Sequence, residues 1–410
     1  MALNGIIGLA VTLWVSAALA EPLTLGALLA EVARGAPAVQ VEHESVAAAA
    51  AGVRRAGAWE DPTVGVMAED LPLPGSMPED HPMLVWRVTQ PLNLFGRRGA
   101  AKDVARAQRT GAEVRRRRVE WDARAEAAGL FFELWMNGEM GLLIDRQVAA
   151  VEAMHASAQS RYAAGLMMGH HDILRADAER AAMEAERASL ADERVAMVAM
   201  LNVLRGLPPD APLGEPVLAI RVPLPPLEGL TAQVEQTPEV AAAQAMRGEM
   251  AARLVLAEKM YLPMVMAGAQ YQQNLGGMPD AWGAELAFTV PVFWWDQQRH
   301  EVDMAEAMLR RADREREAMT RMADAQVRMA WSRARAAERS LEALEGSALP
   351  RMKDAVEAGR SAYIAGSGTL LQWLEDLDAQ LGLEGQRLVA IVQRERARFE
   401  LSRLLGSALP

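Results

Sequence analysis

The 410-residue chain contains no cysteine. Disulfide bonds, thiolate metal sites and a lipid anchor on cysteine are therefore excluded for this sequence. Basic residues are also in the minority, and the formal net charge of −11 argues against nucleic-acid binding through bulk electrostatics. Both features are compatible with an exported protein.

Long hydrophobic runs are missing as well. After residue 20, no segment approaches the roughly 20 apolar residues of a membrane-spanning helix, so membrane insertion would have to use strands. Residues 1–20 combine a short apolar run, Ile6 to Val15, with Ala18-Leu19-Ala20, which offers small residues at the two positions that signal peptidase reads. We interpret residues 1–20 as a cleaved signal peptide, although the usual basic start is absent. An apolar N-terminal helix packed on the body is the alternative.

Catalytic and metal-binding motifs are also lacking. The sequence has no nucleophile motif, phosphate-binding glycine loop or zinc-ligand spacing, and we expect neither an enzyme nor a cofactor. His170-His171-Asp172, with Met167 and Met168 nearby, offers metal-ligating atoms. Adjacent histidines on a helix point about 100° apart and cannot chelate as an i, i+4 pair does. We therefore expect no metal site there.

The chain does contain an internal tandem repeat of about 200 residues. Matched motifs recur 200 or 201 residues apart, which chance does not explain. The clearest pairs are Pro62 with Pro263, Gly75-Ser76-Met77-Pro78 with Gly276-Gly277-Met278-Pro279, and Tyr162-Ala163-Ala164-Gly165 with Tyr363-Ile364-Ala365-Gly366. We predict a first structural repeat at 21–220 and a second at 221–410, within a single domain.

Each repeat has the same predicted order of elements. Amphipathic helical stretches, Leu23 to Ala58 and Leu227 to Met260, precede strand hairpins at about 62–91 and 263–291. The expected strands are Thr63 to Ala68, Leu84 to Gln90, Met264 to Gln272 and Glu285 to Val290, separated by turns rich in glycine and proline. We expect Pro91 and Pro291 to end the hairpins, since proline cannot donate to a strand ladder.

Long helical hairpins follow at about 96–206 and 296–406. The runs from Gly99 to Arg161 and from Arg299 to Leu349 contain no proline and consist largely of strong helix formers. About sixty helical residues make a rod of about 90 Å, which needs neighbours along its length. Heptad-like spacing predicts coiled-coil packing of the return helices; the residues with this spacing are Met183, Leu190, Met197 and Leu204 in one, and Leu374, Leu377, Leu381, Leu388 and Ile391 in the other.

Four strands are too few to close a barrel, for which about eight is the smallest filled size. An exported protein with these hairpins would have to share one barrel among subunits, and three copies would supply twelve strands. Half of the aromatic residues fall in the hairpin regions, as in the aromatic belts of membrane proteins, although any one of them could be core. The membrane-interface candidates are Trp59, Trp86, Trp282, Trp294 and Trp295.

With these motifs in this order, residues 21–410 resemble the TolC-like outer-membrane efflux channels. The resemblance is carried by Leu23-Thr24-Leu25, by Val88-Thr89-Gln90-Pro91-Leu92-Asn93-Leu94-Phe95-Gly96-Arg97-Arg98, by the paired Tyr-Ala-Ala-Gly and Tyr-Ile-Ala-Gly motifs, and by Leu201 to Gly206. The Pro91-to-Arg98 segment is most similar to the heavy-metal efflux branch.

The resemblance implies a mixed α and β membrane protein. In the family, a homotrimer shares a twelve-stranded β-barrel in the outer membrane, which continues into a long α-helical coiled-coil barrel across the periplasm. The channel is passive, contacts outer-membrane lipid, and docks through a periplasmic adaptor protein to an inner-membrane pump, often of the resistance–nodulation–division type. The implied cargo is heavy-metal cations.

The resemblance also assigns candidate residues at the helical tips. Carried over by motif, the adaptor-contact residues are Tyr162, Gly165, Leu166, Tyr363, Gly366 and Ser367. Acidic rings constrict the family's channels just beyond the second tip, and the gate candidates here are Gln372, Glu375, Asp376 and Asp378. Simpler structural explanations remain: glycine suits any helix end, and the charges fit a solvated helix face.

Two alternative functions remain open. The channel could export drugs or other small organic molecules, because the pump rather than the conduit selects the cargo. A periplasmic coiled-coil scaffold, such as an adaptor, also carries long helical hairpins, but it would not show a duplicated pair of strands.

Overall fold

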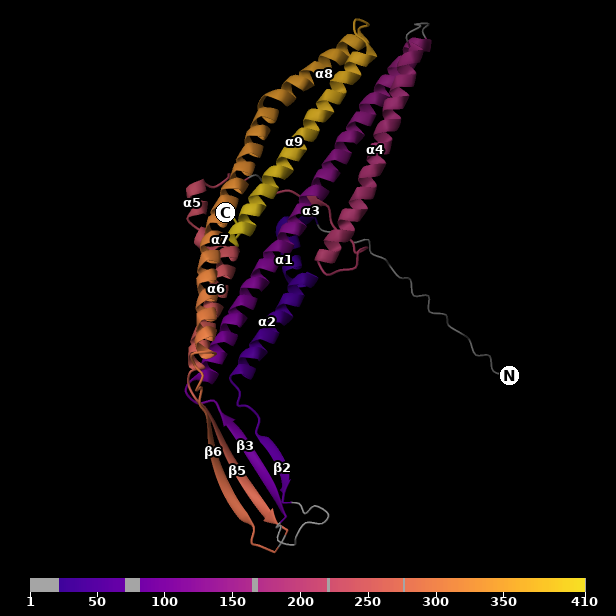
Figure 1. The fold of residues 1–410 in the computed structure, drawn as a ribbon. Helices are drawn as coiled ribbons and strands as arrows, with labels where there is room; N and C mark the ends of the chain where they lie inside the picture. Colours follow the sequence, from indigo (N-terminus) through magenta and orange to yellow (C-terminus); the bar gives the residue numbers. More distant parts are fainter. Residues whose placement is uncertain (1–21, 71–81, 164–168, 220–221, 276, 410) are drawn as a thin grey trace, which may run out of the picture. The chain divides into compact units, whose positions relative to one another are not determined.

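The computed structural model describes residues 22–70, 82–163, 169–219, 222–275 and 277–409. The predicted signal peptide lies outside these residues. The chain forms two compact units (Figure 1). The first comprises Met1–Val32, Ala127–Arg221 and Leu349–Val389; the second comprises Ala33–Glu126, Val222–Ala348 and Ala390–Pro410.

The second unit contains a four-stranded sheet. Its strands are β2 (Thr63–Glu69), β3 (Met83–Leu92), β5 (Met264–Asn274) and β6 (Ala281–Thr289). They are ordered β2-β3-β5-β6, and every neighbouring pair is antiparallel. All four predicted strands are therefore confirmed, with shifted ends.

The prediction that Pro91 ends its hairpin is wrong. Pro91 lies inside β3, opposite Met266 of β5. Pairing with β2 stops at Thr89, which is opposite Thr63, so one side of β3 has no strand neighbour beyond that point. A proline is tolerated where its missing N–H faces no ladder partner.

Proline also divides the helical stretches that were predicted to be continuous. The first consists of β1 (Leu23–Thr24), α1 (Leu25–Gly35) and α2 (Pro37–Ala56); the second consists of α5 (Leu227–Thr231), η1 (Val234–Gln236) and α6 (Pro238–Lys259). Ala36 and Thr237, just before the prolines, have extended backbones with ψ of 125° and 148°. The clash of a proline ring with the preceding residue disfavours helical geometry there.

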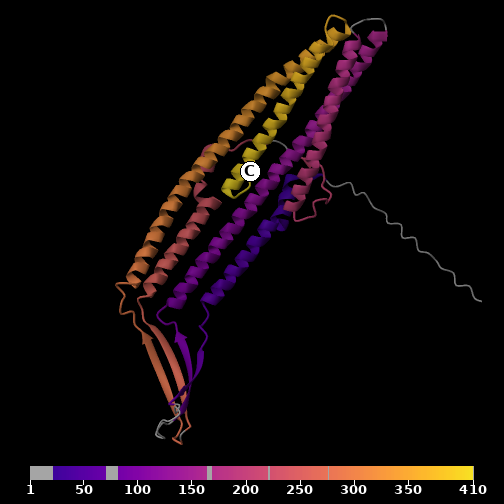
Figure 2. The same ribbon diagram turned by 45° about the vertical axis from the view of Figure 1, so that its right-hand side comes forward.

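In the second unit, helices lie side by side in a layer that continues from one end of the sheet (Figure 2). It comprises α2, the first part of α3 (Arg97–Ala163), α6 and α7 (Gln298–Ala343). α2 runs beside α3 in Figures 1 and 2, and α6 packs along α7. Gln108 of α3 donates to Glu249 of α6 over 3.1 Å, so the order across the layer is α2-α3-α6-α7.

The core of this unit lies where α5, η1, α6 and α7 meet the end of α9 (Leu370–Leu405). Its buried residues include Leu230, Val327 and Leu401. Arg403 fastens the same region through carboxylates of Asp122 at 2.9 Å and Glu400 at 2.8 Å. The hydrogen bond to Glu400 raises the pKa of Arg403 above its usual range, so the Arg403 guanidinium stays charged at any physiological pH.

The first unit is built from the far part of α3, α4 (Gly169–Leu204), α8 (Leu349–Ile364) and α9, with a short parallel pair of β1 and β4 (Pro216–Val217). Its buried cluster draws on all four helices and includes Val151, Ala176, Tyr363 and Trp373. The predicted outgoing helix of the second hairpin passes through the π-helical turn η2 (Leu344–Ala348) and continues as α8. A widened turn accommodates Pro350, whose ring would clash with the carbonyl four residues earlier in a regular helix.

Within the described residues, no helix has both the length and the apolar character needed to cross a membrane.

Arg97 joins the strand and helix layers of the second unit. Its guanidinium donates to the carbonyl oxygens of Lys259 at 3.1 Å and Met260 at 3.0 Å, and also to that of Leu262. These carbonyls lie at the C-terminal end of α6, just before β5, and helix ends leave such acceptors without partners. One cation at the start of α3 therefore fixes the end of α6.

We expect Arg97→Ala to lower the free energy of unfolding of the purified protein by about 2 kcal/mol, because charge-assisted hydrogen bonds to partly buried carbonyls are lost. Thermal melting followed by circular dichroism in detergent measures this. Arg106→Ala is the matched control, since Arg106 only forms an exposed pair with Asp103 at 2.7 Å and should change stability by less than about 1 kcal/mol. Equal losses in both variants would contradict the role assigned to Arg97.

Candidate functional site

The register of the sheet separates apolar from polar side chains. Val66, Trp86, Tyr271 and Trp282 stand opposite one another across the four strands, so they share a face. The other members of this apolar face are Val64, Ala68, Leu84, Val88, Gln90, Leu92, Val265, Ala267, Ala269, Gln273, Ala284, Leu286 and Phe288. It contains no charged residue.

The opposite face carries the charges of the sheet. Glu69, Arg87 and Glu285, the charged residues of the four strands, all lie on it. Gln270, Gln272 and Asn274 line the same side, and Arg87 donates to Gln270 over 3.4 Å. Met67, Val85, Met264 and Met266 also lie on this side, so the two faces differ chiefly in that only one carries charge. A sheet with one side toward water shows such a difference.

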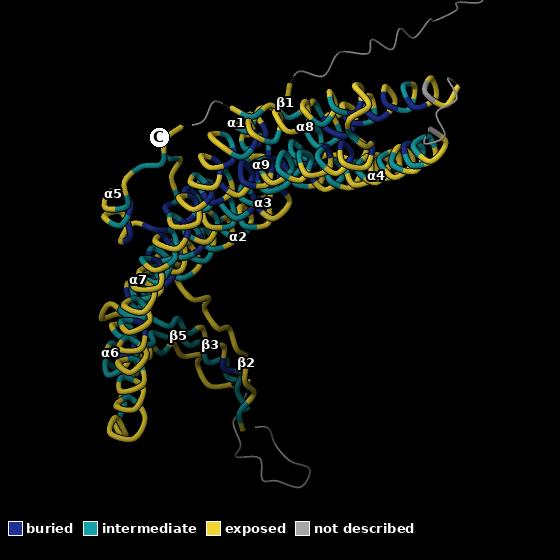
Figure 3. The backbone as a smooth tube through the Cα atoms, turned by 90° about the horizontal axis from the view of Figure 1, so that it is seen from above, coloured by how far each residue is buried: buried dark blue, intermediate teal, exposed yellow. Residues whose placement is uncertain are grey.

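The apolar face is exposed in this chain rather than packed as a core. Trp282 is 80% exposed and Leu286 61% exposed. Figure 3 shows β2, β3 and β5 mainly as intermediate or exposed. A contiguous apolar surface of this kind marks an interaction with a membrane or a partner.

Both edges of the sheet are open among the described residues. β2 pairs only with β3, and β6 pairs only with β5. The neighbouring helices follow the same order, because α2 leads into β2 and β6 leads into α7. The same two sides of the unit are therefore the edges of both the strand layer and the helix layer.

The five predicted interface tryptophans fall into two groups. Trp59, Trp294 and Trp295 lie at the helix end of the sheet, where Trp294 contacts Tyr261 at 6.3 Å and Arg98 lies over the ring of Trp59 at 4.2 Å. Trp86 and Trp282 lie further along the strands, where Trp282 stacks on Tyr271 at 4.8 Å.

The second tip is a defined helix-capping motif. Gly366 has a φ of 78°, and the N–H groups of Gly366 and Ser367 donate to Tyr363 and Ala362 carbonyls over 3.0 Å each. This is the Schellman arrangement, in which glycine adopts the left-handed conformation at the helix end. Gly366 is thus explained by the turn itself. At the first tip, Tyr162 is exposed and its ring contacts His170, whereas Gly165 and Leu166 lie outside the described residues.

Tyr363 does not suit its predicted role as a direct contact residue. Its side chain is only 1% exposed, so it cannot present its ring to an adaptor. It lies in the cluster with Val151 and Trp373, and its hydroxyl lies 3.3 Å from a carboxylate oxygen of Asp172. Tyr363 therefore ties α8 to the start of α4 beside the tip.

Gln372 has a structural role that the sequence analysis missed. Its side-chain oxygen accepts from the backbone N–H of Thr369, while the Thr369 hydroxyl oxygen accepts from the backbone N–H of Gln372 over 3.2 Å. This reciprocal pair is a capping box that starts α9. Thr369-Leu370-Leu371-Gln372 carries that signature in the sequence.

The three acidic gate candidates do not point the same way. Glu375 and Asp378 are exposed, on the side of α9 opposite the buried Trp373 and Leu374. Asp376 is half-buried and lies against Gly359 of α8. The structure therefore brings Glu375 and Asp378 onto one solvent-facing side and separates Asp376 from them.

The His170-His171-Asp172 segment is engaged in local contacts. His171 lies 3.9 Å from the carboxylate of Asp172, and that residue also contacts Tyr363. Across the described ranges, no group of three His, Cys, Asp or Glu residues is placed to hold a metal ion.

Comparison with known proteins supports a channel fold. A family model described as "Outer membrane efflux protein" matches residues 231–407. The chain superposes on a membrane protein from Pseudomonas aeruginosa with a TM-score of 0.81 and 19% identity, covering 94% of this chain and 90% of the other. It superposes on the outer membrane protein VceC of Vibrio cholerae with a TM-score of 0.78 and 17% identity, covering 94% and 97%.

Two similar sequences come from metal-resistance proteins. The nickel-cobalt-cadmium resistance protein NccC of Alcaligenes xylosoxydans xylosoxydans is 25% identical over 297 residues, 71% of this chain and 65% of the relative. The nickel and cobalt resistance protein CnrC of Cupriavidus metallidurans is 25% identical over 66% of this chain and 63% of its own length. The chain thus spans slightly less than two thirds of each relative.

The mixed helical and strand fold and the family match agree with the resemblance drawn from the sequence. The matched family consists of efflux channels and not of enzymes. Residues 231–407 thus match the family of outer membrane efflux proteins, and the chain as a whole is similar in fold to outer membrane proteins.

Proposed function

We propose that this protein is one subunit of a homotrimeric outer-membrane channel, which passively conducts substrate from an inner-membrane pump and a periplasmic adaptor to the exterior. The observation that carries this proposal is the sheet with an exposed apolar face, a polar face and two open edges. Such a sheet fits lipid on one side and water on the other.

The strand directions favour closure by further copies of the same chain. With four antiparallel strands, β6 of one copy runs antiparallel to β2 of the next, and a repeated head-to-tail contact generates a ring. Three copies give twelve strands, above the minimum of about eight for a filled barrel. Each barrel strand then has two neighbours, which removes the open edge that lipid does not tolerate.

The order of elements supports the internal duplication. Helix, two strands and long helices occur as α2-β2-β3-α3-α4 and again as α6-β5-β6-α7-α8-α9. In a trimer each copy contributes two similar structural repeats, 21–220 and 221–410, so the tube would have approximate sixfold symmetry. The long helices would line up as the periplasmic part of the tube.

The helical tips are the proposed contact surface for the adaptor. Tyr162 and Ser367 are exposed, and Gly366 shapes the turn that presents Ser367. Gly165 and Leu166 belong to the same proposal through their motif. The buried Tyr363 does not contact the adaptor in this proposal but holds the second tip in position.

Heavy-metal cations are the proposed cargo. The names of the relatives NccC and CnrC refer to nickel, cobalt and cadmium resistance, and the net charge of −11 favours cations. Expression of this chain with a metal-exporting pump and its adaptor, in a host that lacks its own outer-membrane channel, should restore metal tolerance. Tolerance that stays at the level of the empty vector would contradict the proposal.

The two faces of the sheet allow a direct test of membrane insertion. Leu286→Arg places a cation on the apolar face, at a cost of about 2–4 kcal/mol near the bilayer midplane, and should sharply reduce the protein recovered in outer membranes. Ala287→Arg, one residue on, puts the same side chain on the polar face and should leave recovery near that of wild type. Equal recovery of both variants in membrane fractions would refute the assignment of the faces.

The absence of native cysteine allows a clean test of edge pairing. Cysteine pairs that combine Val64 or Val66 of β2 with Ala284, Leu286 or Phe288 of β6 should form intermolecular disulfides in at least one combination. The reason is that paired strands bring opposite Cβ atoms within about 5.5 Å. A matched control, Val88→Cys with Ala269→Cys, pairs residues that already face each other within one chain and should cross-link only internally. Non-reducing gel electrophoresis separates the products, and monomers from every edge pair would count against a shared barrel.

Glu375 is the best-defined candidate among the gate residues, because its side chain is exposed and forms no ion pair or hydrogen bond with the residues that the structure describes. We expect Glu375→Ala to raise single-channel conductance and to lower cation selectivity in planar bilayers, because the acidic ring at the entrance is removed. Asp354→Ala, an exposed carboxylate on α8, is the control and should change neither property. Unchanged conductance and selectivity in Glu375→Ala would eliminate Glu375 from the gate.

A further inference from the structure

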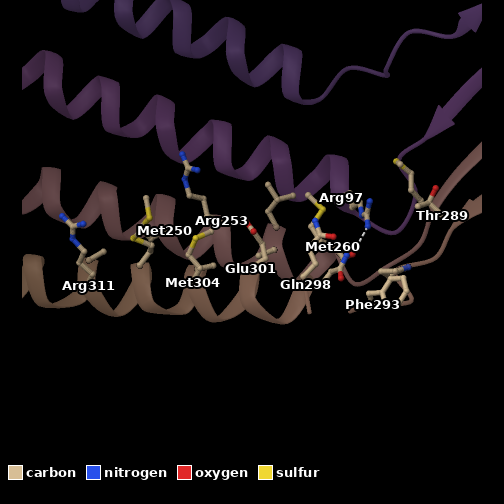
Figure 4. A pocket seen from close by; sticks show the side chains of 18 of the residues that line it. Arg97, Met250, Arg253, Met260, Thr289, Phe293, Gln298, Glu301, Met304 and Arg311 are labelled. Carbon is tan, nitrogen blue, oxygen red and sulfur yellow. Dashed lines mark hydrogen bonds between the residues drawn. The ribbon is translucent and has the colours of Figure 1, made fainter. Parts of the chain in front are cut away.

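A groove of about 910 Å³ runs between α6 and α7, next to the segment that leaves β6. Figure 4 shows it from close by. Apolar and thioether side chains dominate its walls, and Arg97 and Phe293 lie at the end nearest the sheet. Nothing in the channel proposal uses this groove.

Methionines line the groove from both helices. Met246 and Met250 are four residues apart on α6, and Met304 and Met308 are four residues apart on α7. Residues at this spacing share one helix face. In Figure 4, Met250 and Met304 extend from the two helices into the same space. With Met260 and Met264 nearer the sheet, six thioether sulfurs line the groove, and four of them lie on these two helix faces.

These methionines are not fillers of a core. Met304 is 51% exposed and Met246 47% exposed, whereas Met154 in the buried cluster of the first unit is 4% exposed. Methionine that only fills irregular gaps should be buried like Met154. The groove therefore offers sulfur atoms to a ligand from solution.

The charges around the groove leave one carboxylate uncommitted. Arg253 pairs with Glu249 at 2.7 Å, and Arg311 pairs with Glu315 at 2.7 Å. Arg97 is committed to backbone carbonyls. Glu301 also lines the groove, one turn before Met304, and among the described residues its carboxylate has no recorded ion pair or hydrogen bond. Arg97 keeps its positive charge, because its carbonyl partners are neutral, and it therefore balances Glu301. The thioethers rather than a net charge would select the ligand.

We propose that this groove, here called the methionine groove, binds a soft monovalent metal cation of the Cu(I) or Ag(I) class through the thioethers of Met246, Met250, Met304 and Met308. Thioethers select soft cations and bind harder divalent cations weakly. The site needs no histidine or cysteine and differs in ligand chemistry from any site for nickel or cobalt. Binding is pure coordination and involves no change of oxidation state.

Calorimetric titration of the purified, detergent-solubilised protein with silver nitrate in chloride-free buffer tests the proposal. Wild type should bind Ag(I), and replacing all four methionines with leucine should weaken binding by at least about tenfold. Leucine conserves volume, so the fold should persist. If the fourfold variant does not fold, the double variant Met250→Leu/Met304→Leu provides the same comparison. Glu301→Gln should weaken binding by a smaller factor, and Ni(II) should give no competing heat.

Two controls separate this site from general silver binding. Met319→Leu/Met322→Leu/Met329→Leu removes exposed methionines of α7 that lie outside the groove and should leave the affinity unchanged. His170→Ala/His171→Ala should also have no effect. Absence of Ag(I) binding by wild type, equal binding by the groove variant, or equal loss in either control would overturn the proposal. Binding of an apolar fluorescent dye in the groove, without any binding of Ag(I), would also overturn the proposal, because it would identify the groove as a site for apolar ligands. The assay is independent of conduction, so its failure would leave the channel proposal intact.

Discussion

Unpaired backbone groups cannot be left in a hydrocarbon environment, and this constraint governs the architecture of the protein. Among the described residues, β2 and β6 each have one partner strand. Both strands also contribute to the apolar face of the sheet, for example through Val64 and Phe288. Each unsatisfied N–H or C=O group in lipid would cost several kcal/mol. A sheet of this composition is stable in a membrane only when another strand covers each edge.

The helical layer of the same unit has matching edges. α2 precedes the outer strand β2, and α7 follows the outer strand β6, so a neighbour that covers one layer is positioned to cover the other. The cation of Arg97 fixes the junction between the layers by holding the end of α6, one short turn before β5 begins. The strand edge and helix edge are therefore presented together rather than independently.

Local rules predicted much of this fold. The four strands were predictable because β-branched and aromatic residues alternate between turns rich in glycine and proline, and the long helices because proline is absent over long runs. The predictions failed where contacts with neighbouring elements determine the structure. Pro91 is accommodated in β3 because β2 begins only at Thr63, opposite Thr89, and so does not reach Pro91. The sequence of β3 alone does not reveal this register. Tyr363 is buried by helices distant in sequence. The capping box at Thr369 and Gln372, by contrast, was visible in the sequence. The methionine groove was not, because it depends on two helix faces meeting.

We propose above all that one chain supplies four strands of a barrel completed by identical copies. Native mass spectrometry of the complex released from detergent micelles counts those copies directly. The account predicts a single dominant species with the mass of three chains. The protein should be extracted from isolated outer membranes, so that only inserted protein is measured. A dominant species of one or two chains from such a sample would contradict a shared barrel of three copies.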